Sequence, residues 1–429
     1  MKGIGMVIGT GYADKFITED DIRSVVARGL DEAKLDGKRV LAIVPDSTRT
    51  MPMPLMFRLL TERLLGRAAA VDFLVALGTH PAMSEDALNR LFGLNADERA
   101  GRYAGVKIFN HAWDDPAALV SIGNIPASDI RDISGGLMDR DVPVTINKVI
   151  FDYDVLLIIG PVFPHEVVGF SGGNKYLFPG IAGADIIHFF HWLGALITNP
   201  LINGTKETPT RRVVERAARL VELPKKCFAL VTKHAGVHAI YCGEPHEAWS
   251  AAADIAAQTH IRYVDRTYNK VLGIAPEMYD DLWTAGKVMY KLEPVLADGA
   301  DLIIYAPHVD EVSYSHGRII DRVGYHTRDY FLKQMDKFRG VPGGIMAHST
   351  HVKGIGTFVN GIERQRVNVI LATGIPKERC DRINLGYLDY RTINIEEWEG
   401  RENEGVLLVR DAGETLFRLS DRTVPRIED

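Results

Sequence analysis

Three short polar stretches follow apolar runs of the chain and carry most of the groups that could do chemistry. They are residues 45–49 (PDSTR), 78–81 (GTHP) and 160–166 (GPVFPHE). A carboxylate and a guanidinium lie in the first, and an imidazole in each of the others. Ligands of open α/β sheets bind at the carboxyl ends of strands, so these groups could meet at a ligand site. A single histidine after a strand more often makes a structural hydrogen bond, so the signal is their joint placement.

A glycine-rich segment, residues 169–180 (GFSGGNKYLFPG), comes next. Gly172 and Gly173 would let backbone amides approach an anion closely, and Lys175 would add a positive charge. The segment is not a Walker-type phosphate loop, because Asn174 separates the glycines from the lysine and Tyr176 follows it. A flexible loop with a solvated lysine is the alternative interpretation.

The segment 184–193 (ADIIHFFHWL) reads as an apolar helix with His188 and His191 on one face. Imidazole is a ligand for zinc, nickel, copper or iron, so this pair could hold a metal. An HExxH zinc-protease motif is absent. Buried histidines of an apolar helix are the alternative.

The elements that must position these groups alternate between strands and helices. Apolar runs at 38–44, 71–77 and 155–159 predict strands covered on both faces, and Thr18 with Asp21 predicts a capping box that opens a helix over 20–35. Further elements are expected at 54–65, 84–91, 211–221, 280–291, 301–305, 328–338 and 367–372, with a terminal hairpin of 405–410 and 414–419.

This pattern predicts an α/β protein with two domains. Periodicity lapses around 265–278, so we expect a larger N-terminal domain over 1–268 with a mostly parallel sheet. A smaller α/β domain would cover 269–429, and its last strands could pack back on the first domain. In open α/β sheets ligands bind at the carboxyl ends of the strands, where the three polar stretches would meet.

Composition excludes several classes of function. The net charge is −6 over 429 residues, which gives no basic footprint for nucleic acid. No apolar run is long enough to span a membrane, and the start of the chain does not resemble a signal peptide. Three widely spaced cysteines do not make a disulfide framework, so a cytoplasmic protein is expected.

Four segments, in this order, resemble the lactate racemase family, whose members use a nickel-pincer nucleotide. They are Asp46-Ser47-Thr48-Arg49, Gly78-Thr79-His80, the stretch from His165-Glu166 through Ser171-Gly172-Gly173-Asn174-Lys175 to Pro179-Gly180, and His191. The Gly-Gly-x-Lys…Pro-Gly stretch is the most specific. The second half of the chain resembles the family less distinctly, through residues 283–287 (WTAGK).

The resemblance implies a racemase or epimerase that inverts C2 of a 2-hydroxy acid by reversible hydride transfer, with its active site in the cleft between the domains. Lys175 would carry the nickel-pincer nucleotide, and His191 would be the protein ligand to nickel. His80 and His165 would be the paired acid and base. The protein would also depend on the enzymes that make the cofactor.

Other residues receive supporting roles from the same resemblance. Arg49 would clamp the substrate carboxylate, assisted by Lys287. The cofactor's phosphate and ribose would be held by Asp46, Ser47, Thr48, Gly172 and Gly173.

Two departures from the family pattern put lactate itself in doubt. Thr284 stands where lactate-specific members are expected to have glutamine, and Pro81 replaces an arginine. A longer hydroxylated acid, such as a sugar acid, could be bound by some of the polar residues of the second half, which include His308, Tyr314, His316, His348, His351 and Lys353.

Other functions remain open at this point. A nicotinamide-dependent 2-hydroxyacid dehydrogenase would share the arginine and histidine roles, but Gly9-Thr10-Gly11 lacks the third glycine of the dinucleotide motif. A metal-dependent hydrolase could use His165, His188 and His191. An anion- or carbohydrate-binding module is the non-enzymatic alternative.

Overall fold

The computed structural model describes residues 7–234 and 236–426. The chain forms two compact units, of which the first contains Met1–Phe163, Phe170–Ile187 and Arg211–Thr259. The second contains Pro164–Gly169, His188–Thr210 and His260–Asp429. The predicted α/β class with two parts is confirmed. The chain passes back and forth between the units, whereas the sequence placed one boundary after residue 268.

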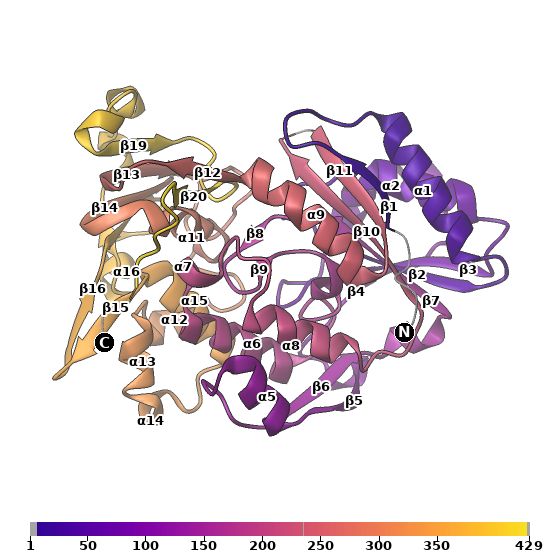
Figure 1. Ribbon diagram of the computed structural model, residues 1–429, viewed down its shortest axis with the longest axis horizontal. Coiled ribbons are helices and arrows are strands. Elements are labelled where there is room, and N and C mark those ends of the chain that lie inside the picture. The colour runs from indigo at the N-terminus through magenta and orange to yellow at the C-terminus, as the bar shows by residue number, and fades with distance from the viewer. Residues whose placement is uncertain (1–6, 235, 427–429) are drawn as a thin grey trace. The chain divides into compact units, whose positions relative to one another are not determined.

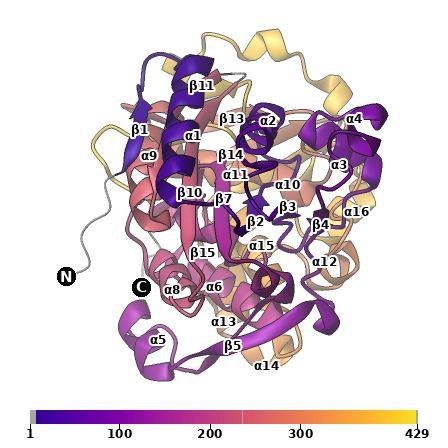
Figure 2. The same ribbon diagram turned by 90° about the vertical axis from the view of Figure 1, so that its right-hand side faces the viewer.

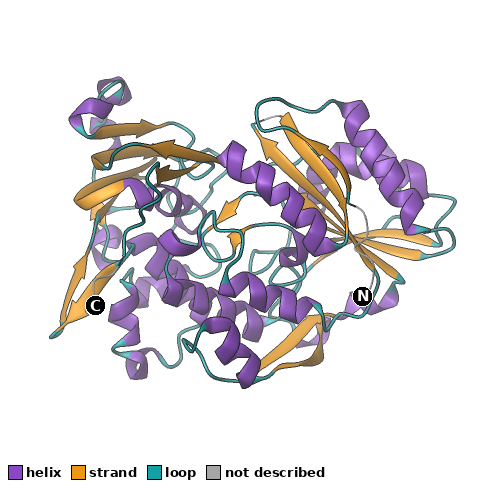
Figure 3. Cartoon of the chain, in the orientation of Figure 1, coloured by secondary structure: helices purple, strands orange, loops and turns teal. Residues whose placement is uncertain are grey.

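The first unit is built on a seven-stranded sheet with the order β1-β11-β10-β7-β2-β3-β4, flanked by helices (Figures 1 and 3). Neighbours from β10 to β4 are parallel, and β11 is antiparallel to both β10 and β1. The strands are β1 (Ile8–Gly11), β2 (Arg39–Val44), β3 (Ala70–Val75), β4 (Ile108–Asn110), β7 (Val155–Pro161), β10 (Lys225–Lys233) and β11 (Gly236–Gly243). A separate antiparallel pair is formed by β5 (Leu119–Ile125) and β6 (Val142–Asn147).

The central strands are buried on both faces, as their apolar runs predicted. Val40, Ala42 and Val44 face one core, while Leu41 and Ile43 are equally buried on the other side of β2. The helices of this unit are α1 (Glu19–Ala33), α2 (Met53–Leu64), α3 (Glu85–Phe92), α4 (Ala96–Ala100), α5 (Ala127–Ser134), α8 (Pro209–Ala218) and α9 (Pro245–His260). Figure 2 shows α1 beside β1 and β11. The predicted capping box of Thr18 and Asp21 opens α1.

The second unit is built on a five-stranded, wholly parallel sheet with the order β18-β17-β14-β13-β19. These strands are β13 (Tyr268–Ile274), β14 (Leu296–Ala306), β17 (Asn368–Thr373), β18 (Gly386–Tyr387) and β19 (Val406–Val409). Smaller pairs are formed by β12 (Ile261–Val264) with β20 (Leu416–Leu419) and by β15 (Gly356–Val359) with β16 (Ile362–Gln365).

The helices of the second unit are short. They are α7 (Asn199–Ile202), α10 (Leu282–Ala285), α11 (Lys287–Leu292), α12 (Gly317–Val323), α13 (Arg328–Leu332), α14 (Met335–Phe338), α15 (Gly343–Lys353) and α16 (Lys377–Arg382). The long helix α6 (Ala184–Ile197) begins in the first unit and continues into the second. Two single helices expected from the sequence, over 280–291 and 328–338, are each split in two.

In the second unit the sequence missed one strand and predicted one wrong strand pairing. The segment 265–278 contains β13, a strand inside the sheet; its apolar run is interrupted by Gly273, where a Cβ atom would lie 2.5 Å from Val288 Cγ1. The predicted terminal hairpin is not formed, because β19 pairs in parallel with β13 and β20 pairs in parallel with β12. Alternating patterns cannot distinguish a hairpin from two strands that join different sheets.

Candidate active site

The strand order in the sheet of the first unit reverses between β2 and β7. From β2 the chain continues outward to β3 and β4, whereas β7 lies on the other side of β2 and leads to β10. Such a switch point is where open α/β sheets bind ligands, because the loops leaving the two strands diverge. The loop after β2 carries Asp46 and Arg49, and β7 ends at Pro161.

Asp46 and His80 form the central contact of this loop cluster. His80 Nδ1 lies 2.5 Å from Asp46 Oδ2, and Asp46 Oδ1 accepts hydrogen bonds from the backbone N–H and the hydroxyl of Thr48. Burial raises the pKa of the Asp46 carboxyl, but His80, Arg49 and Thr48 lower it by more, so this pKa lies well below its ordinary value. An ionised Asp46 fixes the proton of the neutral imidazole on Nδ1 and leaves Nε2 as an acceptor.

Arg49 lies next to this pair. Its Nη1 donates to the carbonyl and the hydroxyl oxygen of Thr48, and its guanidinium lies 5.9 Å from the centre of the Phe163 ring. The neighbouring Ser47 is exposed. Nε and Nη2 of the guanidinium remain for a carboxylate, which Arg binds through two parallel hydrogen bonds.

The segment that carries Lys175 is joined to the His80 loop through backbone contacts. The Gly78 N–H donates to the Gly180 carbonyl, and a Cβ atom at Gly180 would lie 2.9 Å from Ala76 Cβ. Lys175 itself lies on a single turn of 3₁₀ helix, Gly173–Tyr176, and is partly exposed. The structure thus brings Asp46, Arg49, His80 and the lysine-bearing segment together in one unit.

Tyr176 anchors the same segment on the end of β7. A Cβ atom at Gly160 would lie 2.2 Å from its ring, so the glycine makes room for the tyrosine. Burial raises the pKa of the Tyr176 hydroxyl, an effect opposed by Arg49, which shows that the two side chains are close. This tyrosine was not among the predicted site residues.

Gly172 and Gly173 are required by packing. Both have positive φ, and a Cβ atom would lie 2.6 Å from Val162 Cγ2 at the first and 2.8 Å from Trp249 Cβ at the second. Burial raises the pKa of the Cys227 thiol, and the Gly173 backbone opposes part of that rise.

The other predicted residues lie in the second unit. His165, in the short strand β8 (Pro164–His165), is buried, and its Nδ1 accepts a hydrogen bond from the Val167 N–H at 3.1 Å. Glu166 Oε2 lies 3.4 Å from the same nitrogen. When Nδ1 accepts, the neutral ring carries its proton on Nε2.

His191 lies on α6 and is partly exposed, with its ring 4.4 Å from that of Phe190. His188, one turn earlier, accepts a hydrogen bond from the Gly344 N–H at 3.4 Å through Nδ1. The two histidines therefore have different surroundings: His188 contacts the backbone of α15, and His191 lies beside the Phe190 ring. Among residues 7–234 and 236–426 no group of three or more His, Cys, Asp or Glu is arranged to hold a metal.

Lys287 begins α11, and its Nζ lies 4.4 Å above the Tyr279 ring. The neighbouring Thr284 is buried, and its N–H donates to Asp281 Oδ1 at 2.9 Å. Asp281 is the N-cap of α10, so Thr284 belongs to a helix cap.

A cluster of rings surrounds His348 in the same unit. The ring stacks on Trp283 at 3.9 Å, Tyr290 Oη lies 2.8 Å from Nδ1, and Tyr325 Oη lies 3.2 Å from Nε2. The pKa of His348 lies well below its ordinary value. Burial is the main cause, and the charges of His351, His316 and His191 would lower this pKa further. His348 is therefore a neutral ring held among Trp283, Tyr290 and Tyr325.

The remaining polar candidates of the second half are dispersed. His308 Nε2 lies 3.1 Å from the Tyr279 carbonyl, Lys353 donates to the Asn384 carbonyl, and Tyr314 is largely exposed. His316 lies 4.6 Å from the Trp283 ring. Of this group, His316, His348 and His351 adjoin the ring cluster, the last with its ring 5.7 Å from that of Tyr290.

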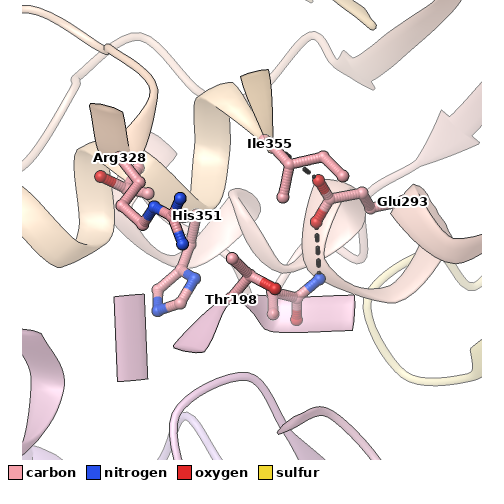
Figure 4. Close-up of a pocket in the computed structure, with 8 residues that line it drawn as sticks. Thr198, Glu293, Arg328, His351 and Ile355 are labelled. Carbon is pink, nitrogen blue, oxygen red and sulfur yellow. Dashed lines mark hydrogen bonds between the residues drawn. The ribbon is translucent and has the colours of Figure 1, made fainter. Parts of the chain in front are cut away.

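His351 lines a small cavity of the second unit together with Thr198, Glu293, Arg328 and Ile355 (Figure 4). Its remaining lining residues are Asn199, Thr350 and Gly354. Glu293 accepts hydrogen bonds from Asn199 Nδ2 and the Ile355 N–H. The cavity has room for about one water molecule, too little for an organic substrate.

Gly9 and Gly11, considered for a dinucleotide motif, lie inside β1. Cβ atoms there would lie 2.2 Å from the Tyr241 ring and 2.4 Å from Ala239 Cβ, so close strand packing requires both glycines. All three cysteines are free and buried. No helix among the described residues is long and apolar enough to cross a membrane.

Comparison with known proteins supports the resemblance seen in the motifs. Residues 17–201 match the model of the lactate racemase N-terminal domain. Lactate racemases from Lactiplantibacillus plantarum and Thermoanaerobacterium thermosaccharolyticum are 30% and 29% identical over 200 and 207 residues. The matched regions cover 44% and 47% of this chain. They cover 42% and 44% of those relatives, so the chain spans less than half their length.

Solved structures align over nearly the whole chain. A protein from Thermotoga maritima has a TM-score of 0.87 at 31% identity, over 94% of this chain and 99% of that one. The lactate racemase apoprotein from Thermoanaerobacterium thermosaccharolyticum has a TM-score of 0.71 at 19% identity, over 97% and 95%, which shows a shared fold. Residues 17–201 are thus similar to the lactate racemase N-terminal domain, and the resemblance drawn from the motifs is confirmed.

Proposed function

We propose that this chain is a racemase or epimerase that inverts C2 of a 2-hydroxy acid, with a nickel-pincer nucleotide attached to Lys175. The observation that carries the proposal is the Asp46–His80 pair, held beside the lysine-bearing segment at the switch point of the sheet. The match of residues 17–201 to the lactate racemase N-terminal domain supports it.

The residues present fit such a cofactor. Lys175 is partly exposed on its 3₁₀ turn, so its amine can be reached by the enzymes that attach the group. His191 would supply the protein ligand to the nickel of the cofactor, because imidazole suits this metal. When bound, the cofactor would accept and return the hydride of the substrate C2–H bond.

His80 would take the proton of the substrate hydroxyl as the C2–H bond breaks. Its Nδ1 proton is directed at the ionised Asp46, so Nε2 has a free electron pair for this proton. Asp46 would stabilise the imidazolium that forms, which is a role different from the cofactor contact expected from the sequence. Asp46 is thus a positioning residue for His80.

His165 would serve the opposite face of C2 as the second acid and base. As the imidazolium, its ring would donate a proton from Nε2 to the oxygen of the 2-oxo acid and return to the neutral form. Glu166, whose Oε2 lies 3.4 Å from Nδ1, would stabilise the charged ring. One histidine would begin as the neutral base and the other as the charged acid, as a reaction that removes and then returns a hydroxyl proton requires.

Arg49 would bind the substrate carboxylate through Nε and Nη2, because Nη1 is engaged by Thr48. Lys287 would provide a further positive charge toward the substrate or cofactor. Holding the carboxylate fixes which face of C2 each imidazole meets.

Intact-protein mass spectrometry after coexpression with the cofactor-making enzymes tests the proposal. We expect a mass increment that maps to Lys175, disappears in Lys175→Ala, and accompanies interconversion of the two enantiomers of a 2-hydroxy acid. Lactate, malate and gluconate should be compared in the same assay. A natively folded chain with no adduct under conditions that load a known lactate racemase would refute the proposal.

A further inference from the structure

The backbone just before Lys175 is bound by three side chains that the sequence did not single out. They are Arg211 and Glu215 of α8 and Trp249 of α9, called here the α8–α9 scaffold. All three lie in the first unit, as Lys175 does. Arg211 and Trp249 are fully buried.

Arg211 spans two carbonyl groups of the segment. Its Nη1 donates to the Gly172 carbonyl at 3.2 Å, and its Nη2 donates to the Phe170 carbonyl. The guanidinium also stacks on the Trp249 ring at 4.1 Å. A buried charge is costly and an apolar side chain could fill the same volume, so this arginine contributes something other than packing.

The other two members bind the positions between and after these carbonyls. Trp249 Nε1 donates to the Ser171 carbonyl at 2.8 Å, and Glu215 Oε2 accepts from Asn174 Nδ2 at 2.6 Å. Gly173 packs against Trp249 Cβ. Every residue from Phe170 to Asn174 is therefore in contact with the scaffold.

The charges of the scaffold balance. Glu215 Oε1 lies 3.6 Å from Arg211 Nη1 and 3.8 Å from Nδ1 of the half-exposed His246. Burial raises the pKa of Glu215, but His246, Arg211 and Asn174 lower it by more. An ionised Glu215 thus neutralises the buried guanidinium.

We propose that the α8–α9 scaffold positions Lys175: it fixes the backbone from Phe170 to Asn174 so that the lysine amine is presented in one conformation for cofactor attachment. This inference rests on the proposed function. A group attached to a lysine is placed only as accurately as the backbone that carries the lysine. Contacts of the attached group itself can act only beyond the lysine side chain. Arg211, Glu215 and Trp249 are positioning residues, since none need touch the substrate.

The test compares Arg211→Met with a matched control, Arg366→Met, in the full chain. Arg366 is also a mostly buried arginine that binds two carbonyl groups, those of Leu296 and Glu293, but it lies in the second unit. The measurements are amide hydrogen exchange of the 170–176 peptide in the apoprotein, acetylation of Lys175 by an N-hydroxysuccinimide ester, and the adduct at Lys175 after coexpression.

Arg211→Met should speed exchange in the 170–176 peptide by about tenfold or more, change the Lys175 acetylation rate, and reduce the adduct to about a tenth of the wild-type level. Arg366→Met should lower the melting temperature comparably and leave all three readings unchanged. Arg211→Lys, which can still donate to carbonyl groups, should restore part of the loading.

Two milder variants keep the inference testable if Arg211→Met does not fold. Trp249→Phe retains a stacking ring and loses the hydrogen bond to Ser171, and Glu215→Gln retains a carbonyl acceptor for Asn174. The first should lose loading, and the second, which leaves the buried guanidinium of Arg211 without its counter-charge, should lose part of it. Equal loading in wild type, Arg211→Met and Trp249→Phe would overturn the inference. An unmodified wild type would instead count against the proposed function, and the exchange measurement would still decide whether the scaffold fixes the segment.

Discussion

Replacing Asp46 by asparagine tests the proton-transfer assignment directly. The side chain keeps its size, and an amide Oδ1 can still accept from the N–H and hydroxyl of Thr48. The other oxygen, 2.5 Å from His80 Nδ1, becomes an NH₂ group that donates. The imidazole must then accept at Nδ1 and carry its proton on Nε2, so the base is lost while the ring stays in place.

The expected loss of turnover is large and the loss of stability is modest. Removing a correctly placed and correctly protonated base costs about 100- to 10,000-fold in kcat. Exchanging one charge-assisted hydrogen bond for a neutral one costs about 1–3 kcal/mol in the free energy of unfolding. The nickel content and the adduct at Lys175 should not change, because neither involves Asp46 in this assignment.

The assay measures racemisation of the loaded enzyme from each enantiomer, with ¹⁵N NMR of His80 to identify the tautomer. Asp72→Asn is the control, since Asp72 is another buried carboxylate of the same sheet. It is buried and accepts hydrogen bonds from the Tyr153 hydroxyl and the Lys107 N–H, neither of which belongs to the His80 loop. Turnover of Asp46→Asn within about threefold of Asp72→Asn would refute the assignment of His80 as an oriented base.

Three further predictions address the metal ligand, the buried histidines and the cavity. His191→Ala should lose nickel, measured by elemental analysis, and keep the adduct at Lys175; retained nickel would contradict the ligand assignment. Burial lowers the pKa of His111 to about 4 and that of His351 to about 3. Both rings therefore take up a proton on unfolding when the pH is below ~6.5. Each histidine should lower the free energy of unfolding by about 1.4 kcal/mol per pH unit as the pH falls from there toward its pKa in the folded protein. Denaturant titrations at pH 6.5, 5.5 and 4.5 check this, and His111→Asn should flatten the slope. The Thr350 hydroxyl and His351 Nε2 have no protein partner among the described residues, and both line the cavity. If a water bridges them, Thr350→Val should lower the free energy of unfolding by about 1 kcal/mol. A raised melting temperature would instead indicate a dry cavity.

The sequence predicted three strands of the first unit, β2, β3 and β7, and the edge where its polar groups gather, but not β1, β4, β10 and β11. Runs such as 39–44 are apolar on both faces because helices cover both sides of a parallel sheet, and this signal is local. The contact between Asp46 and His80 was not predicted, because it joins loops after two different strands. In the sequence, the carboxylate of Asp46 beside Ser47 and Thr48 fitted a contact to the cofactor as well as a contact to His80.

The α8–α9 scaffold was missed for a related reason. Arg211 stands in an amphipathic helix beside Arg212, where a charged residue usually indicates the solvent-exposed face. Its burial depends on carbonyl groups about 40 residues earlier in the chain, which no local pattern reveals. The division into units was missed because His165 and His191 lie on short segments, Pro164–Gly169 and His188–Thr210, that belong to the second unit.

The position of Thr284 bears on which acid is used. The sequence led us to compare it with a glutamine of lactate-specific relatives, but here both its N–H and its hydroxyl bond Asp281, the cap of α10. Burial raises the pKa of Asp281, and these hydrogen bonds oppose that rise, so the threonine has a structural partner and does not offer an amide to a substrate. Position 284 therefore gives no reason to expect that this chain prefers lactate as its substrate.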